Sequence, residues 1–407
     1  MPGYGSRYWA DRTKPGRRRT YPICRGTHQA DVVVVGGGLT GCLMASVLAG
    51  GGFDVVLVEA ERLATGATER GLSAVLPQPA RSFREAESAL GRRGAKTVWR
   101  DVRRSARELA TALRKLPIRC DVEPMPLTVN ARTLDESAWL RREQKSRKDA
   151  GLNASWLTPQ AARAELGTDS AGALRLHDGA VFDPVRATLG FAASAAARGA
   201  RVFERTLVKK TRFTRTEAEV VLADGSIRAR GVVLATAEPG SLAPQLKRHV
   251  RCSTGYVVVT APLNAAMRRE VGSRQTVLTE AADDPHFIRW LPEDRALVAG
   301  ALSKPVGPRP SDRALVQRTA QLMYELSVRY PVISGLPAAW GWDVPVVSAL
   351  DGLPWIGPHR NYPFHFFALA LGWHGEALAW FAARAALRHF KGEARKDDAA
   401  FGFGRHG

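Results

Sequence analysis

The stretch from Asp31 to Glu59, DVVVVGGGLTGCLMASVLAGGGFDVVLVE, decides the fold of this chain. A run of valines ends in a glycine-rich turn, an apolar helical segment follows, and a second apolar run closes on an acidic residue. Gly36 permits a tight strand-to-helix turn, Gly38 lets the backbone approach a pyrophosphate, and Gly41 lets the helix pack closely on the strand. The pyrophosphate is expected on the free N–H groups of the helix N-terminus. The stretch therefore predicts a site for an adenine dinucleotide.

Glu59 ends the second strand, about 20 residues after the first glycine. A carboxylate at this place accepts hydrogen bonds from a ribose 2′-hydroxyl and repels a 2′-phosphate, which argues against NADP. An ordinary glycine turn after a buried strand is the alternative, but it does not explain the whole succession of strand, glycines, helix, strand and acid. These residues alone leave both NAD and FAD open.

The composition is that of a globular protein: 407 residues with 45% hydrophobic side chains, enough for two domains or one elaborated fold. No apolar run approaches the ~20 residues that cross a bilayer. Arg17–Arg19 precede a polar segment rather than a signal-peptide core, so we expect a cytoplasmic protein. The four cysteines are spaced for neither zinc nor a disulfide framework, and we expect no metal site: they are Cys24, Cys42, Cys120 and Cys252.

The formal net charge is +20. Such a charge suggests either an acidic partner such as nucleic acid, or the background of an arginine-rich proteome. The basic residues are scattered in pairs along the chain, as at Arg103-Arg104 and Lys209-Lys210. We therefore favour the background and expect no nucleic-acid partner.

The pattern along the chain predicts an α/β fold in which a Rossmann-like nucleotide-binding domain is interleaved with an antiparallel-sheet α+β substrate domain. Residues 1–30 are expected to form an arm that lies over the domain. The nucleotide-binding domain takes residues 31–85, 170–245 and 338–407, and the substrate domain takes 86–169 and 246–337. Predicted helices are 97–116, 134–150, one opening at Thr158-Pro159, 184–198, 312–330 and 376–390; predicted strands are 32–35, 55–58, 201–204, 232–237, 256–260, 275–278, 287–291 and 296–299.

Five motifs then carry a resemblance. They are the glycine fingerprint with Glu59; Gly66-Ala67-Thr68; Gly179-Ala180-Val181-Phe182-Asp183-Pro184; Val233-Leu234-Ala235-Thr236-Ala237; and Asp351-Gly352-Leu353-Pro354-Trp355-Ile356-Gly357-Pro358 with Gly372-Trp373-His374-Gly375. Together they resemble the FAD-dependent amino-acid and amine oxidases of the D-amino-acid oxidase, glycine oxidase and sarcosine oxidase type. The resemblance covers nearly the whole chain from about residue 30.

The resemblance implies an FAD-binding domain and assigns cofactor-binding residues. The ADP half is expected at Gly36, Gly38, Gly41 and Glu59; the pyrophosphate and ribityl chain at Arg62, Ala67 and Thr68; the adenosine at Val208 and Thr236; and the isoalloxazine at Gly357, His374 and Gly375. The helix that begins after Gly375 would point its positive end at the flavin N1–C2=O edge. No histidine or cysteine follows the Gly-Ala-Thr loop, so we expect non-covalent FAD.

Three residues depart from the family pattern. Glu69 would be unfavourable beside a pyrophosphate unless it pairs with Arg70. Ala237 stands where glycine is usual, and Glu376 opens the last helix where a small or apolar residue is expected.

The implied reaction is oxidation of a C–N bond in a small amine or amino acid. A hydride passes to flavin N5, the imine hydrolyses, and oxygen or an electron-transfer partner reoxidises the flavin. Arg289 is the candidate for clamping a substrate carboxylate, with an ordinary solvated strand arginine as the alternative. Tyr256 could line the same pocket or pack in the core, and His374 is expected to position flavin rather than transfer a proton.

Four tryptophans could form an aromatic cage for an amine, although core packing explains most of them: Trp290, Trp340, Trp342 and Trp373. Two other functions stay open at this stage. The charge suggests a tRNA-modifying flavin oxidase module, and the departures at Glu69, Ala237 and Glu376 suggest a flavoprotein without amine turnover. The sequence does not select the substrate, the electron acceptor or the oligomeric state.

Overall fold

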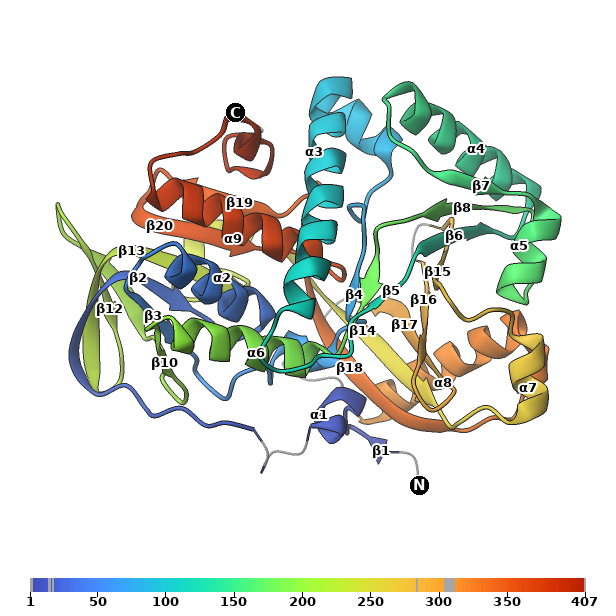
Figure 1. The fold of residues 1–407 in the computed structure, drawn as a ribbon, viewed down its shortest axis with the longest axis horizontal. Helices are drawn as coiled ribbons and strands as arrows, with labels where there is room; N and C mark the ends of the chain where they lie inside the picture. Colours follow the sequence, from blue (N-terminus) through green and yellow to red (C-terminus); the bar gives the residue numbers. More distant parts are fainter. Residues whose placement is uncertain (1–2, 14–15, 17, 283–284, 304–311, 406–407) are drawn as a thin grey trace.

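The computed structural model describes residues 3–13, 16, 18–282, 285–303 and 312–405. Within these residues the strands form an eight-stranded sheet, a nine-stranded sheet and a small three-stranded sheet. Figure 1 shows the eight-stranded sheet on the left with α2, α6 and α9, and the nine-stranded sheet on the right with α4, α5, α7 and α8. Two sheets, each with its own helices, form the α/β architecture that the sequence predicts.

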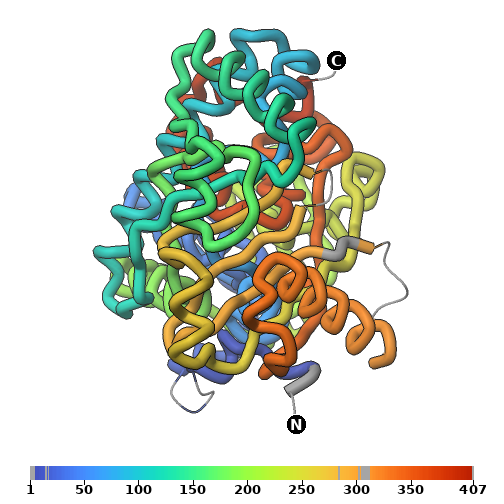
Figure 2. The backbone as a smooth tube through the Cα atoms, turned by 90° about the vertical axis from the view of Figure 1, so that its right-hand side faces the viewer, coloured from blue at the N-terminus to red at the C-terminus, as the bar shows by residue number. Residues whose placement is uncertain are grey.

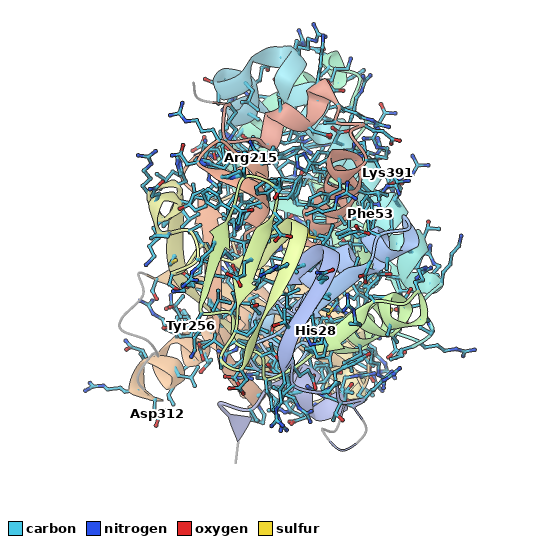
Figure 3. All side chains as sticks on the ribbon, turned by 90° about the vertical axis from the view of Figure 1, so that its left-hand side faces the viewer. His28, Phe53, Arg215, Tyr256, Asp312 and Lys391 are labelled. Atoms are coloured by element: carbon cyan, nitrogen blue, oxygen red, sulfur yellow. The ribbon has the colours of Figure 1, made fainter. Side chains whose placement is uncertain are left out.

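The eight-stranded sheet is built around the valine run that opens the fingerprint. Its parallel centre has the order β10, β3, β2, β13, β20, and β11, β12 and β19 add antiparallel pairs. The bounds are β2 Gly26–Val35, β3 Val55–Val58, β10 Arg201–Phe203, β11 Lys210–Phe213, β12 Ala218–Val221, β13 Gly225–Ala237, β19 Trp355–His359 and β20 Tyr362–Leu369. Figure 3 faces this sheet, with His28 marking β2.

Both faces of this parallel centre are buried, which explains why the strands read as unbroken apolar runs. Val32 and Val34 pack into the core that contains α2, whereas Val33 and Val35 pack into a second core on the opposite face. Three helices that pack on one another cover the first face: α2 Leu39–Gly50, α6 Pro184–Ala197 and α9 Glu376–Phe390.

The nine-stranded sheet has the order β1, β18, β14, β17, β16, β15, β6, β8, β7 and is mainly antiparallel. Its strands are β1 Gly3–Tyr4, β6 Leu127–Ala131, β7 Ser155–Leu157, β8 Gly172–Leu176, β14 Val250–Thr260, β15 Val277–Glu280, β16 Phe287–Leu291, β17 Arg295–Ser303 and β18 Ala338–Ala349. The helices beside it are α4 Leu134–Asp149, α5 Pro159–Leu166, α7 Ala265–Glu270 and α8 Asp312–Arg329. Seen from its own side, α4 and α5 (green) lie above α7 and α8 (yellow to orange) (Figure 2).

The remaining elements lie outside the two large sheets. The three-stranded sheet consists of β4 Ala74–Val75, β9 Ala180–Val181 and β5 Glu123–Pro124. Helix α3, Phe83–Arg114, packs on α9 and α4, and α1 is the short helix Tyr8–Arg12. Short 3₁₀ helices occupy Ala67–Arg70, Pro244–His249, Pro331–Ile333 and Lys396–Phe401.

Three expectations about the elements need correction. Helix α3 begins at Phe83 rather than at residue 97, with a capping box between Ser82 and Glu85 and a non-helical Gly91 inside it. The N-terminal arm ends earlier than residue 30, because β2 already begins at Gly26. Strands β8 and β18, which lie in segments assigned to the nucleotide-binding domain, pair within the nine-stranded sheet instead. The division of the chain into two domains itself stays a prediction.

Candidate active site

A cavity of about 480 Å³ lies at the carboxyl ends of the parallel strands. Its walls come from four regions: the glycine turn after β2, the loop after β3, the end of β13, and the start of α9 with its preceding loop. Ligands of open α/β sheets bind at this edge, where the strand order reverses. Of the predicted cofactor residues, those that line the cavity are Gly36, Gly38, Glu59, Arg62, Ala67, Thr68, Val208, Thr236 and Gly375.

The fingerprint glycines have the geometry that their spacing predicts. Gly36 has a φ of +110°, and a Cβ there would lie 2.6 Å from the carbonyl oxygen of Ala235. A Cβ on Gly41 would lie 1.8 Å from the carbonyl oxygen of Gly36, so helix and turn touch backbone to backbone. Gly38 is the N-cap of α2 and has no capping side chain. The N-terminus of α2 therefore opens into the cavity.

Polar side chains near the fingerprint glycines also hold the glycine turn and the loop after β3 in place. The Glu59 carboxylate accepts from the N–H groups of Gly37 (2.5 Å) and Glu61 (2.8 Å). Thr68 Oγ1 accepts from the Leu39 N–H at 2.9 Å, at the point of the helix where an anion would bind. Arg62 pairs with Glu204, Nη1 to Oε2, at 3.0 Å.

At the other end of the cavity, the start of α9 meets the nine-stranded sheet. Gly375 is the N-cap of α9 without a capping side chain, and Glu376 is its first residue. Both line the cavity together with Trp373, and residues 344–347 of β18 line it as well. A Cβ on Gly255 of β14 would lie 2.1 Å from Trp373, so that glycine makes room for the indole. No sequence pattern had indicated that β18 contributes to the cavity wall.

Two residues expected at the isoalloxazine do not line the cavity. His374 packs against Phe287 with ring centroids 4.0 Å apart, and burial lowers its pKa to about 3, so its ring is neutral. Gly357 lies within β19 at a φ of +135°. The neutral His374 agrees with a positioning role rather than with proton transfer.

The departures from the family pattern have local explanations. Glu69 is buried, and its carboxylate forms ion pairs with Arg7 and Arg18 of the N-terminal arm. Arg70 pairs with Asp343 at 3.0 Å. Ala237 has a φ of +65°, a left-handed conformation that explains why glycine is the usual residue there.

Arg289 is buried rather than solvated, but it does not line the cavity. Its Nη1 donates to the carbonyl oxygens of Leu72 (3.0 Å), Ser73 (2.8 Å) and Phe182 (3.1 Å). The guanidinium lies 4.9 Å from the ring centroid of Trp9, and burial lowers its pKa to about 10. Because Ser73 lines the cavity, Arg289 supports its wall from behind.

The structure does not bring the other aromatic candidates together. Tyr256 is buried in the core beneath α8, where Trp290 packs against Tyr330 at 5.9 Å. Trp340 meets the Tyr8 ring of the arm edge to face, and Trp342 donates to the carbonyl oxygen of Arg70. Of the four tryptophans, Trp373 is the one that lines the cavity, so no cage of these four forms.

Metal centres and membrane spans are two further kinds of site to consider for the described residues. No cluster of three potential metal ligands occurs in them, and none of their helices is long and apolar enough to cross a membrane. All four cysteines are free; Cys24, Cys42 and Cys120 are buried and Cys252 is exposed.

The donor set of the cavity suits FAD. The N-termini of α2 and α9 both line it, neither N-cap glycine carries a capping side chain, and each helix N-terminus suits an electron-rich group. The Glu59 carboxylate also lines the cavity, and such a group can accept hydrogen bonds from ribose hydroxyls. At the flavin side, Oε2 of Glu376 is buried and has no hydrogen-bond partner among the described residues. A cofactor with polar edges would satisfy this atom.

The comparisons with known proteins agree with this geometry. Residues 31–388 match the model of the DAO family, described as FAD dependent oxidoreductase. The gamma-glutamylputrescine oxidoreductase of Escherichia coli is 26% identical over 373 residues, which cover 91% of this chain and 85% of that protein.

Solved structures share the fold. Glycine oxidase from Geobacillus kaustophilus matches with a TM-score of 0.78 at 21% identity, over 93% of this chain and 99% of that one. L-proline dehydrogenase from P. horikoshii matches with a TM-score of 0.77 at 18% identity, over 92% and 97%. Since the family model spans most of the chain and the cavity carries the family's dinucleotide fingerprint, this protein belongs to the FAD-dependent oxidoreductase family.

Proposed function

We propose that this protein oxidises a C–N bond of a small amine or amino acid, with FAD bound non-covalently. The similar proteins are named for such substrates: a gamma-glutamylputrescine oxidoreductase, a glycine oxidase and an iminodiacetate oxidase. When bound, FAD supplies the two-electron oxidation by accepting a hydride from the carbon next to nitrogen.

One observation carries the proposal. The cavity that begins at the dinucleotide fingerprint ends against the second sheet, where Val344–Val347 of β18 and Trp373 form its wall. A dinucleotide site alone would need no such wall. A sheet beside the flavin would give this part of the cavity a largely apolar wall, next to which a neutral amine is favoured over its ammonium form.

The residues of this chain have separate tasks in the proposal. Gly36, Gly38 and the N-terminus of α2 hold the pyrophosphate, and Glu59 holds the ribose. Thr68 and Arg62 line the middle of the cavity, and Val208 and Thr236 lie on the adenosine side. Trp373 gives the substrate an apolar surface.

Non-covalent attachment is supported by the lining of the cavity. Covalent flavins are bonded to histidine, cysteine or tyrosine side chains, and no such residue is among the described residues that line the cavity. Cys42 is near in sequence, but it is fully buried in α2, and burial strongly raises the pKa of its thiol.

The test is reduction of bound flavin under anaerobic conditions by a panel of amines and amino acids. Loss of the oxidised-flavin absorbance with a subset of the panel supports the proposal and identifies the substrate class. A yellow protein that no member of the panel reduces would contradict amine turnover. Acid precipitation should release the flavin into the supernatant, and colour kept in the pellet would contradict non-covalent binding.

A further inference from the structure

Glu376 is an acidic side chain in an unusual place. It is the first residue of α9, and it lines the cavity beside Gly375 and Ala379. Its Oε2 atom is shielded from solvent and has no hydrogen-bond partner among the described residues. A buried carboxyl oxygen without a partner is costly, so a polar group that enters the cavity and reaches this oxygen would be stabilised by it.

The surroundings favour the neutral acid. Burial raises the pKa of Glu376 to about 8, against the opposing effects of backbone N–H groups and of Arg289 on β16. Besides Glu376, the Arg289 guanidinium also faces the carboxyl groups of Asp183 before α6 and Glu123 of β5. His374, in the loop before α9, is neutral. The two phosphates of FAD would add negative charge to the cavity and favour the neutral form further.

We propose that Glu376 is a cofactor-positioning residue that stays protonated in the holoprotein and donates its O–H to the electron-rich edge of the flavin. This inference rests on the proposed FAD site. A neutral acid at the first position of α9 adds a donor beside the free N–H groups of the helix N-terminus. An ionised carboxylate there would instead repel that edge, so deprotonation of Glu376 must weaken FAD binding.

The same carboxyl could instead be a counter-ion for a substrate ammonium group, but two features argue against it. A counter-ion has to be charged, whereas burial keeps Glu376 neutral near pH 7. The side chain also stands at a helix N-terminus, where the positive end of the helix dipole disfavours a substrate ammonium group and favours an electron-rich one. A counter-ion role predicts better substrate binding at high pH and no effect on FAD affinity.

The experiment is a titration of the apoprotein with FAD between pH 6 and pH 10, followed by flavin fluorescence without substrate. For the parent protein, the apparent Kd for FAD should be constant up to pH 7 and should rise about tenfold by pH 9. The reason is that the free protein's Glu376, with a pKa of about 8, is half ionised near pH 8. Glu376→Gln keeps the shape and a neutral N–H donor, so its Kd should stay flat. Glu61→Gln makes the same charge change at an exposed place on the cavity wall and should keep the rise of the parent.

The outcomes separate this inference from the proposed function. A flat profile for the parent protein, which needs no variant to fold, would overturn the inference and leave the FAD site intact. A rise that persists in Glu376→Gln would also overturn it. Absence of FAD binding at every pH in all three proteins would instead refute the proposed function.

Discussion

Arg289 shows at the scale of one residue how position decides between a catalytic and a supporting role. We expect Arg289→Met to lower the free energy of unfolding by about 2–4 kcal/mol, because the buried carbonyl oxygens of Leu72, Ser73 and Phe182 lose their donor. FAD content should fall too, since Ser73 lines the cavity. Denaturant unfolding and flavin absorbance measure both effects, with Arg251→Met, an exposed arginine of β14, as the control. Normal stability with a defect confined to carboxylate substrates would favour the clamp role.

His374 should make the protein sensitive to mild acid. Its folded pKa, lowered by burial to about 3, lies below the unfolded value of about 6.5. As the pH falls below 6.5 the unfolded chain takes up a proton that the folded protein refuses, so stability is lost progressively down to about pH 3. His374→Gln should remove at most about 2 kcal/mol of the loss measured between pH 7 and pH 5. Identical pH profiles for parent and variant would contradict this account.

Single residues were predictable from the sequence where the backbone alone sets their role. Gly36 and Gly41 follow from spacing, because a Cβ at either position would collide with the backbone of the turn or of β13. Side chains whose role depends on distant contacts were not predictable. Nothing near Glu69 in the sequence reveals that its partners are Arg7 and Arg18, more than 50 residues away.

Among the elements, the contact between α2 and the turn after β2 is the most demanding. We expect Gly41→Ala to cost more than about 4 kcal/mol and to abolish FAD binding, because its Cβ would lie 1.8 Å from a backbone oxygen that has no room to move. Gly50→Ala is the matched control in the same helix, since its Cβ meets the flexible side chain of Arg198 at 3.4 Å. Equal FAD binding by the two variants would show that helix and turn can separate without loss of the site.

Helices whose first residues carry a clear capping pattern have the bounds that agree best with the prediction. Pro184–Ala197 and Pro159–Leu166 begin with a capping Asp183 or Thr158 followed by proline. The first half of α3 was missed because residues 83–96 are polar and include Gly91 and Gly94, although Ser82 and Glu85 form a capping box that the sequence already contains. The sheet membership of β8 and β18 was not predictable, because strand patterns do not specify their partners.

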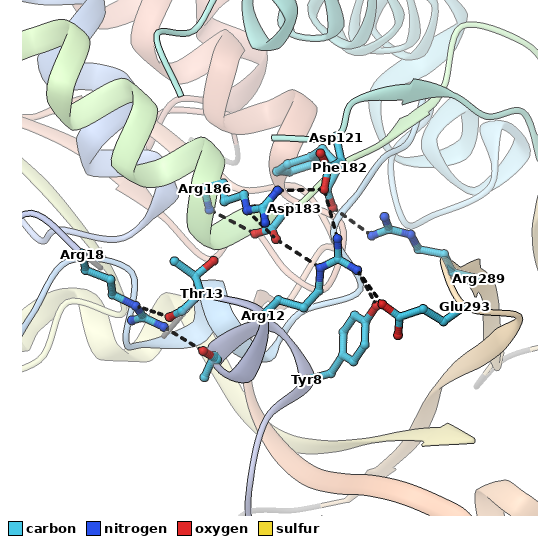
Figure 4. Close-up of polar contacts among 11 residues, drawn as sticks. Tyr8, Arg12, Thr13, Arg18, Asp121, Phe182, Asp183, Arg186, Arg289 and Glu293 are labelled. Atoms are coloured by element: carbon cyan, nitrogen blue, oxygen red, sulfur yellow. Dashed lines mark hydrogen bonds and ion pairs between the residues drawn. The ribbon is translucent and has the colours of Figure 1, made fainter. Parts of the chain in front are cut away.

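In the whole molecule, the N-terminal arm links parts that are far apart in the chain. Arg12 of α1 donates to Tyr8 and pairs with Asp121 after α3, and it approaches both Asp183 before α6 and Glu293 after β16 (Figure 4). Strand β1 adds to the edge of β18, and Trp9 donates to the carbonyl oxygen of Gly71. The arm therefore contacts both the nine-stranded sheet and the loop at Gly71, which lines the cavity.

These contacts predict that the N-terminal arm and the loop of residues 66–71, part of which lines the cavity, stabilise each other. Arg7→Gln should cost about 1–3 kcal/mol and lower FAD content, because Glu69 stays buried at 3% exposure with Arg18 as its more distant partner, at 3.8 Å. Adding Glu69→Gln should restore part of the loss, since the second change removes the buried charge that the first leaves behind. A double-mutant cycle on unfolding free energy measures the coupling, which we expect to be about 1 kcal/mol or more. Arg25→Gln, at an exposed arginine, controls for the loss of positive charge. Strictly additive costs would mean that Glu69 is stabilised without the arm, and the arm would then have no influence on the loop that holds the cofactor.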